Sequence, residues 1–374
     1  MLKRLYVNGY KTLVNFDLEI ENINILLGQN GVGKSSIVEV LCSLKNFLSN
    51  DGQKAENCFS RDDVTKWINT QNAFTQQFEI ELENDGNIYK YSLCIEHNFS
   101  EKKTRVSSEE LLYNSNKLYS YNVKTGEAIL YRDNFSQGPS YMFDWSRSGI
   151  GGIFERSDNK LLINFKKSIQ NIVIAKLSPS LIGSEADNET ENPNYDMSNF
   201  ANWYLYLTQS RQSQVFDYTL KLREIFSGFS ALQFAPSGDK KILEAVFDNG
   251  TTDIKIRFDK LSDGQKTIII LYALLYCLPK KDISLILDEP ENYLALPEIH
   301  FWLSALDAQV LDGLKQAFII SHHPRLINFL AKDAGLWMYR DTQNSPTRIQ
   351  KISATDDTTM SIDKLVELNW ITDV

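Results

Sequence analysis

The pattern of apolar and polar positions along the chain predicts a mixed α/β protein. In the first hundred residues, alternating apolar positions and one continuous apolar run indicate strands. A turn at residues 84–87 joins two of them into a hairpin. After the continuous run, residues 37–44 have the apolar spacing of a helix. The expected strands cover residues 2–7, 16–20, 23–27, 78–82 and 88–95.

The middle of the chain, residues 97–230, has a different character and is rich in Tyr, Asn, Ser and Lys. We expect helices at residues 159–171 and 200–226, and no coiled coil because no heptad pattern is sustained. This segment is interpreted as a mostly helical insertion into one domain. A long apolar helix is expected at residues 267–278, too short to span a bilayer and therefore buried in a core. Strand patterns return before it at residues 231–235, 241–247 and 253–258.

A glycine-rich segment joins the strand at residues 23–27 to the helix at residues 37–44. Its sequence, GQNGVGKSS, fits GxxxxGK[ST], the phosphate-binding loop of P-loop nucleotidases. Such a loop directs several backbone N–H groups and the positive end of a helix dipole at one phosphate. Lys34 is expected to reach the β- and γ-phosphates of ATP, and the Ser35 hydroxyl to hold Mg²⁺. The expected nucleotide-binding residues are Asn30, Gly31, Val32, Gly33, Lys34, Ser35 and Ser36.

A second motif opens the long apolar helix. The sequence Leu261-Ser-Asp-Gly-Gln265 resembles the LSxGQ signature of ABC-type ATPases. In that family the signature binds the γ-phosphate held by the P-loop of a second copy. A serine that only caps a core helix remains the alternative. The resemblance assigns this role in trans to Ser262, Asp263, Gly264 and Gln265.

A third motif follows the apolar run at residues 284–287. Asp288-Glu289-Pro290 resembles a Walker B, in which Asp288 helps to hold Mg²⁺ and Glu289 polarises the attacking water as general base. Magnesium bound to phosphates takes only one or two protein oxygens, which fits Ser35 and Asp288 as metal residues.

The fourth motif ends the apolar run at residues 317–320. Ser321-His322-His323 resembles the switch strand whose histidine senses the γ-phosphate. The family spacing places the sensor at His322, with His323 as the alternative. The expected catalytic residues are Glu289, His322 and Lys34.

These four motifs stand in the order that ABC-type ATPases use. The resemblance implies an ABC-ATPase head: a mixed sheet around the P-loop helix and an antiparallel N-terminal β-subdomain, with the mostly helical insertion. Residues 1–96 would form the N-terminal half, residues 97–230 the insertion, and residues 231–374 the C-terminal half and tail. Gln76 and Gln77 are candidates for the Q-loop that links nucleotide to insertion, with two surface glutamines as the alternative.

The early P-loop and the D-loop sequence after Glu289 are similar to the SMC and OLD-like branch of the family. The residues after Pro324 are too few for the Toprim nuclease domain of OLD proteins, so we expect no nuclease activity from this chain alone. Compact ATPases of this kind resemble the ATPase components of bacterial anti-phage systems. Their neighbour is typically a nuclease or toxin effector.

Composition narrows the range of partners. The net charge of −9 argues against a surface covered in positive charge for binding nucleic acid. A local basic patch is still compatible with this net charge, and nucleic acid could bind here or on a partner. The four cysteines have no CxxC spacing and predict reduced thiols. No signal peptide and no membrane span are recognised, so a cytoplasmic location without membrane contact is expected.

The function predicted from the sequence is therefore ATP hydrolysis with ATP and Mg²⁺ as cofactors. Two copies would associate head to tail around ATP, as a homodimer or a higher oligomer, and would control a separate effector in anti-phage defence. Two alternatives stay open: a DNA-repair or recombination clamp, and a scaffold that binds ATP with little turnover.

Overall fold

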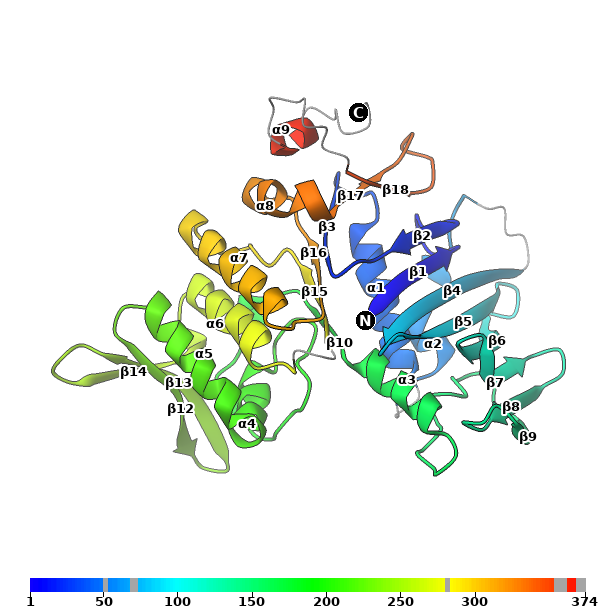
Figure 1. The fold of residues 1–374 in the computed structure, drawn as a ribbon, viewed down its shortest axis with the longest axis horizontal. Coiled ribbons are helices and arrows are strands. Elements are labelled where there is room, and N and C mark those ends of the chain that lie inside the picture. The colour runs from blue at the N-terminus through cyan, green and yellow to red at the C-terminus, as the bar shows by residue number, and fades with distance from the viewer. Residues whose placement is uncertain (50–52, 68–72, 280–282, 353–361, 368–374) are drawn as a thin grey trace. The chain divides into compact units, whose positions relative to one another are not determined.

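A computed structural model describes residues 1–49, 53–67, 73–279, 283–352 and 362–367. The chain forms two compact units, one of Met1–Ile172 with Leu330–Val374 and one of Val173–Phe329 (Figure 1). Each unit contains strands and helices, which confirms the predicted α/β class. The chain passes between the units twice: after Ile172, which lies inside the segment 97–230 and not at either of its ends, and after Phe329.

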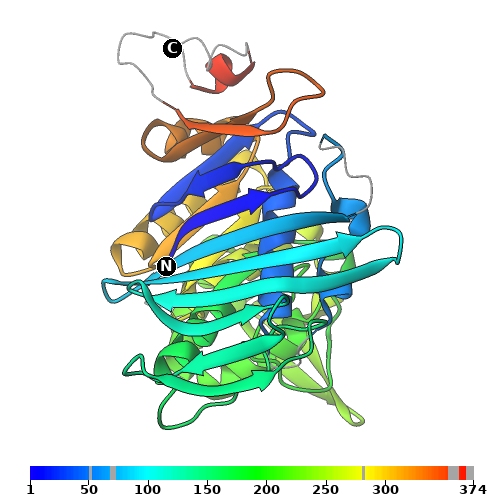
Figure 2. The same ribbon diagram turned by 90° about the vertical axis from the view of Figure 1, so that its right-hand side faces the viewer.

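The first unit contains a large antiparallel sheet, which Figure 2 shows face on with its central strands in cyan. Its strands alternate buried and accessible positions, as period-two patterning requires. On strand β5, Tyr89 and Tyr91 pack against Phe165 of helix α3 (Lys160–Gln170). In spatial order the strands are β2 (Phe16–Glu19), β1 (Leu2–Asn8), β4 (Ala73–Asn84), β5 (Asn87–Asn98), β6 (Lys103–Tyr113), β7 (Asn116–Asn122), β8 (Glu127–Tyr131) and β9 (Gln137–Met142).

The expectation of a mostly helical insertion is wrong for its first part, because β6 to β9 lie within it. Buried polar residues explain why their apolar alternation is weak. Thr104 and Glu109 occupy buried positions of β6. Thr104 is hydrogen-bonded to His97, and Glu109 accepts from Tyr91 and Ser148. These polar groups are buried at little cost because each has a partner.

The P-loop segment lies in the first unit between β3 (Ile23–Gly28) and α1 (Lys34–Phe47). Strand β3 is parallel to β17 (Gly335–Tyr339), which pairs in turn with β18 (Arg348–Lys351). The apolar face of α1 is buried, including Ile37, Leu41 and Phe47. The strand, loop and helix thus confirm the predicted local structure. The first unit also contains α2 (Ala55–Cys58) and α9 (Ile362–Glu367), and α8 (Pro324–Ala334) begins in the second unit and ends in the first.

The second unit is built around helix α6 (Asp263–Tyr276), whose residues 266–275 are all buried. The helix packs against α5 (Gln212–Ile225) and α7 (Leu296–Leu311), and the Tyr218 hydroxyl of α5 donates to the Ile269 carbonyl. The predicted core helix is therefore confirmed. Strands β10 (Ile172–Ala175), β15 (Ser284–Asp288) and β16 (Gln316–Ile320) lie side by side in this order, with β15 parallel to β16.

A small antiparallel sheet and helix α4 (Phe200–Ser210) complete the second unit. Its strands are β11 (Glu185–Ala186), β12 (Phe229–Ser237), β13 (Lys240–Asp248) and β14 (Asp253–Arg257). Within the described residues of both units, no helix is long and apolar enough to cross a membrane.

Candidate functional site

Two glycines give the P-loop its shape. Gly31 has φ of 80° and Gly33 has φ of 105°, both in the left-handed region that favours glycine. A Cβ atom on Gly33 would lie 2.4 Å from the Thr12 hydroxyl oxygen. Thr347 and Thr12 both donate to the Val32 carbonyl, so the loop backbone is fixed from two other segments of the first unit. Any larger residue at position 33 would disturb this arrangement.

Lys34 and Ser35 lie where the loop becomes helix α1. The Lys34 ammonium donates to the Gly28 carbonyl at 2.6 Å and to the Gln29 carbonyl at 3.1 Å. Ser35 is exposed, whereas Ser36 is buried and its N–H donates to the Gly33 carbonyl. The first turn of α1 contains no acidic residue, so nothing there opposes an anion at the helix N-terminus.

In the second unit, the parallel strands β15 and β16 bring the Walker B and histidine motifs together. Asp288 is opposite Ile320 in the register, and the Glu289 N–H donates to the Ile320 carbonyl at 2.8 Å. The next residues therefore leave the same edge of the sheet. His322 Nδ1 lies 3.3 Å from a Glu289 carboxylate oxygen. Neither segment alone contains this contact.

The backbone at Glu289 is left-handed, with φ of 52°. This conformation is uncommon for a residue with a Cβ atom and turns the chain sharply at the end of the strand. The Asn292 side-chain amide donates to the other Glu289 oxygen at 3.1 Å. Glu289 is thus held by neighbours on both of its oxygens.

His322 and His323 have different surroundings. The His322 side chain is 64% exposed and contacts Glu289, whereas His323 Nδ1 accepts from the Arg325 N–H. Partial burial and the nearby His322 and Arg325 charges lower the pKa of His323. Of the two predicted alternatives, His322 is the one that touches the Walker B pair.

Glu291, two residues after Glu289, plays a supporting part. Its side chain is buried and accepts a hydrogen bond from the Ser321 hydroxyl. Desolvation raises the pKa of Glu291, against the opposing effect of that hydrogen bond. Ser321 also accepts from the His323 N–H. This small network fixes the start of the histidine segment against the turn after β15.

Sequence reasoning missed two residues that contact Asp288. The Lys176 ammonium lies 3.0 Å from Asp288 Oδ2 and 3.6 Å from a Glu289 oxygen. The Tyr195 hydroxyl donates to the same Asp288 oxygen at 3.3 Å. Partial burial lowers the pKa of Lys176, but Asp288 and Glu289 together outweigh it, so its pKa is raised. The available signal was a lysine directly after the apolar run at residues 172–175.

The signature residues form a regular helix start. Ser262 is the N-cap of α6: its hydroxyl accepts from the Gln265 N–H, and the Gln265 side chain accepts from the Ser262 N–H. A Cβ atom on Gly264 would lie 3.0 Å from the Tyr293 carbonyl oxygen in the D-loop segment. Ser262 therefore caps α6, and its role in trans on the nucleotide of a second copy remains a separate prediction.

Gln76 and Gln77 lie on strand β4. Gln76 is fully buried, its amide nitrogen donates to the Gly9 carbonyl, and its amide oxygen is bonded to His97. Gln77 is exposed and accepts from the Asn8 side chain. The amide nitrogen and the amide oxygen of Gln76 therefore both make hydrogen bonds within the first unit. The Q-loop role of either glutamine remains a prediction.

The donor set suits magnesium held mainly by phosphates. No group of three or more His, Cys, Asp or Glu side chains arranged for a metal occurs in the part of the chain that the structure describes. Magnesium in nucleotide sites needs only one or two protein oxygens, and the Ser35 hydroxyl of the first unit and the Asp288 carboxylate of the second are each a hard oxygen donor of the kind it takes. The residues present therefore fit Mg²⁺ as a companion of ATP.

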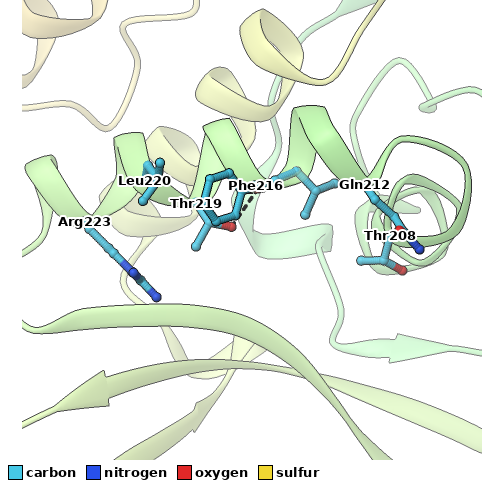
Figure 3. Close-up of a pocket in the computed structure, with 7 residues that line it drawn as sticks. Thr208, Gln212, Phe216, Thr219, Leu220 and Arg223 are labelled. Carbon is cyan, nitrogen blue, oxygen red and sulfur yellow. Dashed lines mark hydrogen bonds between the residues drawn. The ribbon is translucent and has the colours of Figure 1, made fainter.

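A separate shallow pocket lies on helix α5, away from all of these motifs in the sequence (Figure 3). It exposes apolar side chains of Phe216 and Leu220 beside polar groups. Its lining contains no residue of the four motifs. The lining residues are Thr208, Gln212, Val215, Phe216, Thr219, Leu220 and Arg223.

Comparison with known proteins identifies the family. Residues 23–328 match the family model described as "AAA domain, putative AbiEii toxin, Type IV TA system". The chain belongs to this family. The matched range includes the P-loop, the signature, the Walker B and both histidines, and membership supports an ATPase. No curated protein matches the sequence.

The fold is that of SMC head domains. The SMC head bound to the C-terminal winged-helix domain of ScpA is 11% identical with a TM-score of 0.52, over 98% of this chain and 99% of that one. The SMC head derived from Pyrococcus furiosus, bound to the C-terminal domain of ScpA, is 10% identical with a TM-score of 0.51, over 100% and 99%. These likenesses confirm the predicted fold of an SMC-like head.

Proposed function

We propose that this protein binds ATP with Mg²⁺ and hydrolyses it, and that two copies associate head to tail around the nucleotide. Phosphates would bind the N–H groups at Gly31, Gly33 and the start of α1, with the Lys34 ammonium beside them. When bound, Mg²⁺ would neutralise part of the phosphate charge, with Ser35 and Asp288 as its protein donors.

The Glu289 carboxylate would accept a proton from the attacking water, and His322 would hold Glu289 in position. The contact of 3.3 Å between these two side chains is the single observation that supports hydrolysis best. The register of β15 and β16 brings together these two residues, which are 33 positions apart in the sequence, and a base held by a neighbouring side chain is in keeping with the proposed role. The family match supports the same activity.

The output is proposed to be control of a separate effector, a nuclease or toxin, in anti-phage defence. The family description places such a domain in a toxin–antitoxin system, which is in keeping with a role in defence. In the proposed dimer, Ser262 and Gly264 of one copy face the P-loop of the other. The chain itself is proposed to cut no nucleic acid.

Calorimetric titration with Mg·ATP tests the nucleotide site. Lys34→Ala is expected to lose most ATP affinity, because an ammonium beside phosphates makes strong charge-assisted hydrogen bonds. Lys124→Ala, which removes an exposed lysine from the β7–β8 turn, serves as the matched control and should bind as the wild type does. Equal affinity in all three proteins would refute the P-loop assignment.

Mass photometry of Glu289→Gln with and without ATP tests the dimer. Doubling of mass with ATP, absent in a Glu289→Gln, Lys34→Ala double variant, is expected. A monomer under both conditions would refute association around ATP. Purification from native cells with a co-purifying nuclease or toxin would support the effector role.

A further inference from the structure

The two Walker B carboxylates of the second unit, Asp288 and Glu289, share one positively charged neighbour, Lys176. Lys176 follows the last residue of the buried strand β10, which is a neighbour of β15 in the sheet. Its ammonium lies 3.0 Å from Asp288 Oδ2 and 3.6 Å from Glu289 Oε2. The Asp288 side chain is 3% exposed and the Lys176 side chain 38%. One half-buried lysine thus contacts both carboxylates.

The position of Lys176 is fixed by backbone contacts. The Lys176 N–H donates to the Tyr195 carbonyl at 2.8 Å, and the Ser178 N–H donates to the Asp196 carbonyl at 3.3 Å. The same Tyr195 turns its hydroxyl to Asp288 Oδ2. Two segments, around residues 176 and 195, are therefore joined to each other and both deliver a donor to one carboxylate oxygen.

These contacts have two consequences for Asp288. A buried carboxylate without a partner is costly, so Lys176 and Tyr195 hold the Asp288 side chain where it stands. The same donors occupy electron pairs of one carboxylate oxygen, Oδ2, and the ammonium repels a divalent cation near this carboxylate through Coulomb's law. The Lys176 ammonium and the Tyr195 hydroxyl therefore both position Asp288 and compete with a metal ion for it.

We propose that Lys176, assisted by Tyr195, is a positioning residue of the Walker B pair that competes with Mg²⁺ for Asp288. It holds Asp288 and Glu289 in place, and it raises the concentration of Mg²⁺ that nucleotide binding requires. The negative charge of a bound triphosphate would outweigh the positive charge of Lys176, so Asp288 would accept Mg²⁺ more readily when nucleotide is bound. This inference rests on the proposed function, because it concerns the same nucleotide site.

The test is a MgCl₂ titration of binding of a fluorescent, non-hydrolysable ATP analogue to the full chain. Lys176→Met keeps the length of the side chain and removes its charge. The Mg²⁺ concentration for half-maximal binding should fall about threefold to fivefold, as expected for loss of a partly exposed ion pair. Lys176→Arg should restore the wild-type requirement, and Tyr195→Phe should lower it by less than Lys176→Met does.

A merely structural role predicts a different result. In that case Lys176→Met would lower the melting temperature but leave the Mg²⁺ requirement unchanged or raised, and either outcome would overturn the proposal. If Lys176→Met fails to fold, Lys176→Gln replaces it, because glutamine keeps a hydrogen-bond donor without the charge. Lys176→Gln should likewise lower the Mg²⁺ concentration for half-maximal binding.

Failure of the proposed function is distinguishable from failure of this inference. If the wild type binds no nucleotide at any Mg²⁺ concentration, the ATP site itself is refuted. Binding of Mn²⁺ alone, followed by electron paramagnetic resonance, still tests the competition. Tighter Mn²⁺ binding by Lys176→Met than by the wild type is expected, and equal or weaker binding would overturn it.

Discussion

The P-loop of the first unit and the Walker B site of the second are built in opposite ways. The P-loop is one contiguous segment whose shape comes from its own glycines, with Thr12 and Thr347 as external supports. The Walker B site collects side chains from four separate segments, at Lys176, Tyr195, Asp288 with Glu289, and His322.

This difference teaches where each site is vulnerable. A contiguous loop fails when its backbone is disturbed, and the expected loss is in phosphate binding. A site assembled from several segments depends on the register of the strands that carry them. Each side chain in such a site has its own chemical role. Changes in the P-loop should therefore act on nucleotide affinity, and changes around Asp288 on turnover and metal dependence.

The largest effect is expected for Glu289→Gln, which removes the proposed base and keeps the shape of the side chain. ATP turnover should fall roughly 10²- to 10⁴-fold, the usual contribution of a general acid or base. Phosphate release under saturating ATP measures this. Glu224→Gln, at an exposed position of α5, is the matched control. Unchanged turnover in Glu289→Gln would remove Glu289 from the mechanism.

The next largest effect is a loss of folding stability at low pH, which should be greater in the first unit than in the second. Burial lowers the pKa of His97 in the first unit from 6.5 to about 4, with a smaller contribution from the Arg61 charge. Between these values the unfolded chain binds a proton that the folded chain does not, so stability falls as pH drops from 6.5 towards 4. The loss should reach about 1–3 kcal/mol.

Hydrogen exchange at pH 7 and pH 4.5 checks this effect in each unit. Amides of β4 and β5 should lose more protection than those of β15, and His97→Asn should reduce the difference. Equal loss of protection in all three strands of both proteins would show that His97 does not carry the acid sensitivity.

Gly33→Ala probes the backbone of the P-loop. The left-handed φ and the approach to Thr12 should cost about 1–3 kcal/mol of folding free energy or of ATP binding. Gly152→Ala is a suitable control, because a Cβ atom there meets nothing within 4 Å and no left-handed φ is required. Wild-type ATP affinity and stability in Gly33→Ala would show that the loop is not held as tightly as these contacts imply.

The smallest effect concerns Ser262, which caps α6. Ser262→Ala should lower the free energy of unfolding by about 1 kcal/mol, and Ser262→Asn should restore it because asparagine also caps helices. If the serine hydroxyl also acts in trans on ATP, both variants lose ATP-dependent association and turnover. If Ser262→Asn turns over ATP normally, the residue is a cap and nothing more. Thermal unfolding and phosphate release on the same samples decide between the two.

The motifs could be found from the sequence because each depends on residues close together along the chain. GxxxxGK[ST] specifies a turn and a helix start locally, and buried strands before Asp288 and Ser321 are visible as apolar runs. The strands β6 to β9 were missed because partnered polar residues such as Glu109 take core positions there. Hydropathy does not reveal which polar side chain will find a partner.

The sequence by itself determined the P-loop, the order of the four motifs, the buried helix α6 and the family resemblance, because these rest on local spacing and on apolar periodicity. Only the tertiary structure decided that His322 rather than His323 contacts Glu289, and that Lys176 and Tyr195 share one oxygen of Asp288. Such contacts depend on which strands are neighbours and in what register. That information arises from packing of the whole unit and is absent from any single segment.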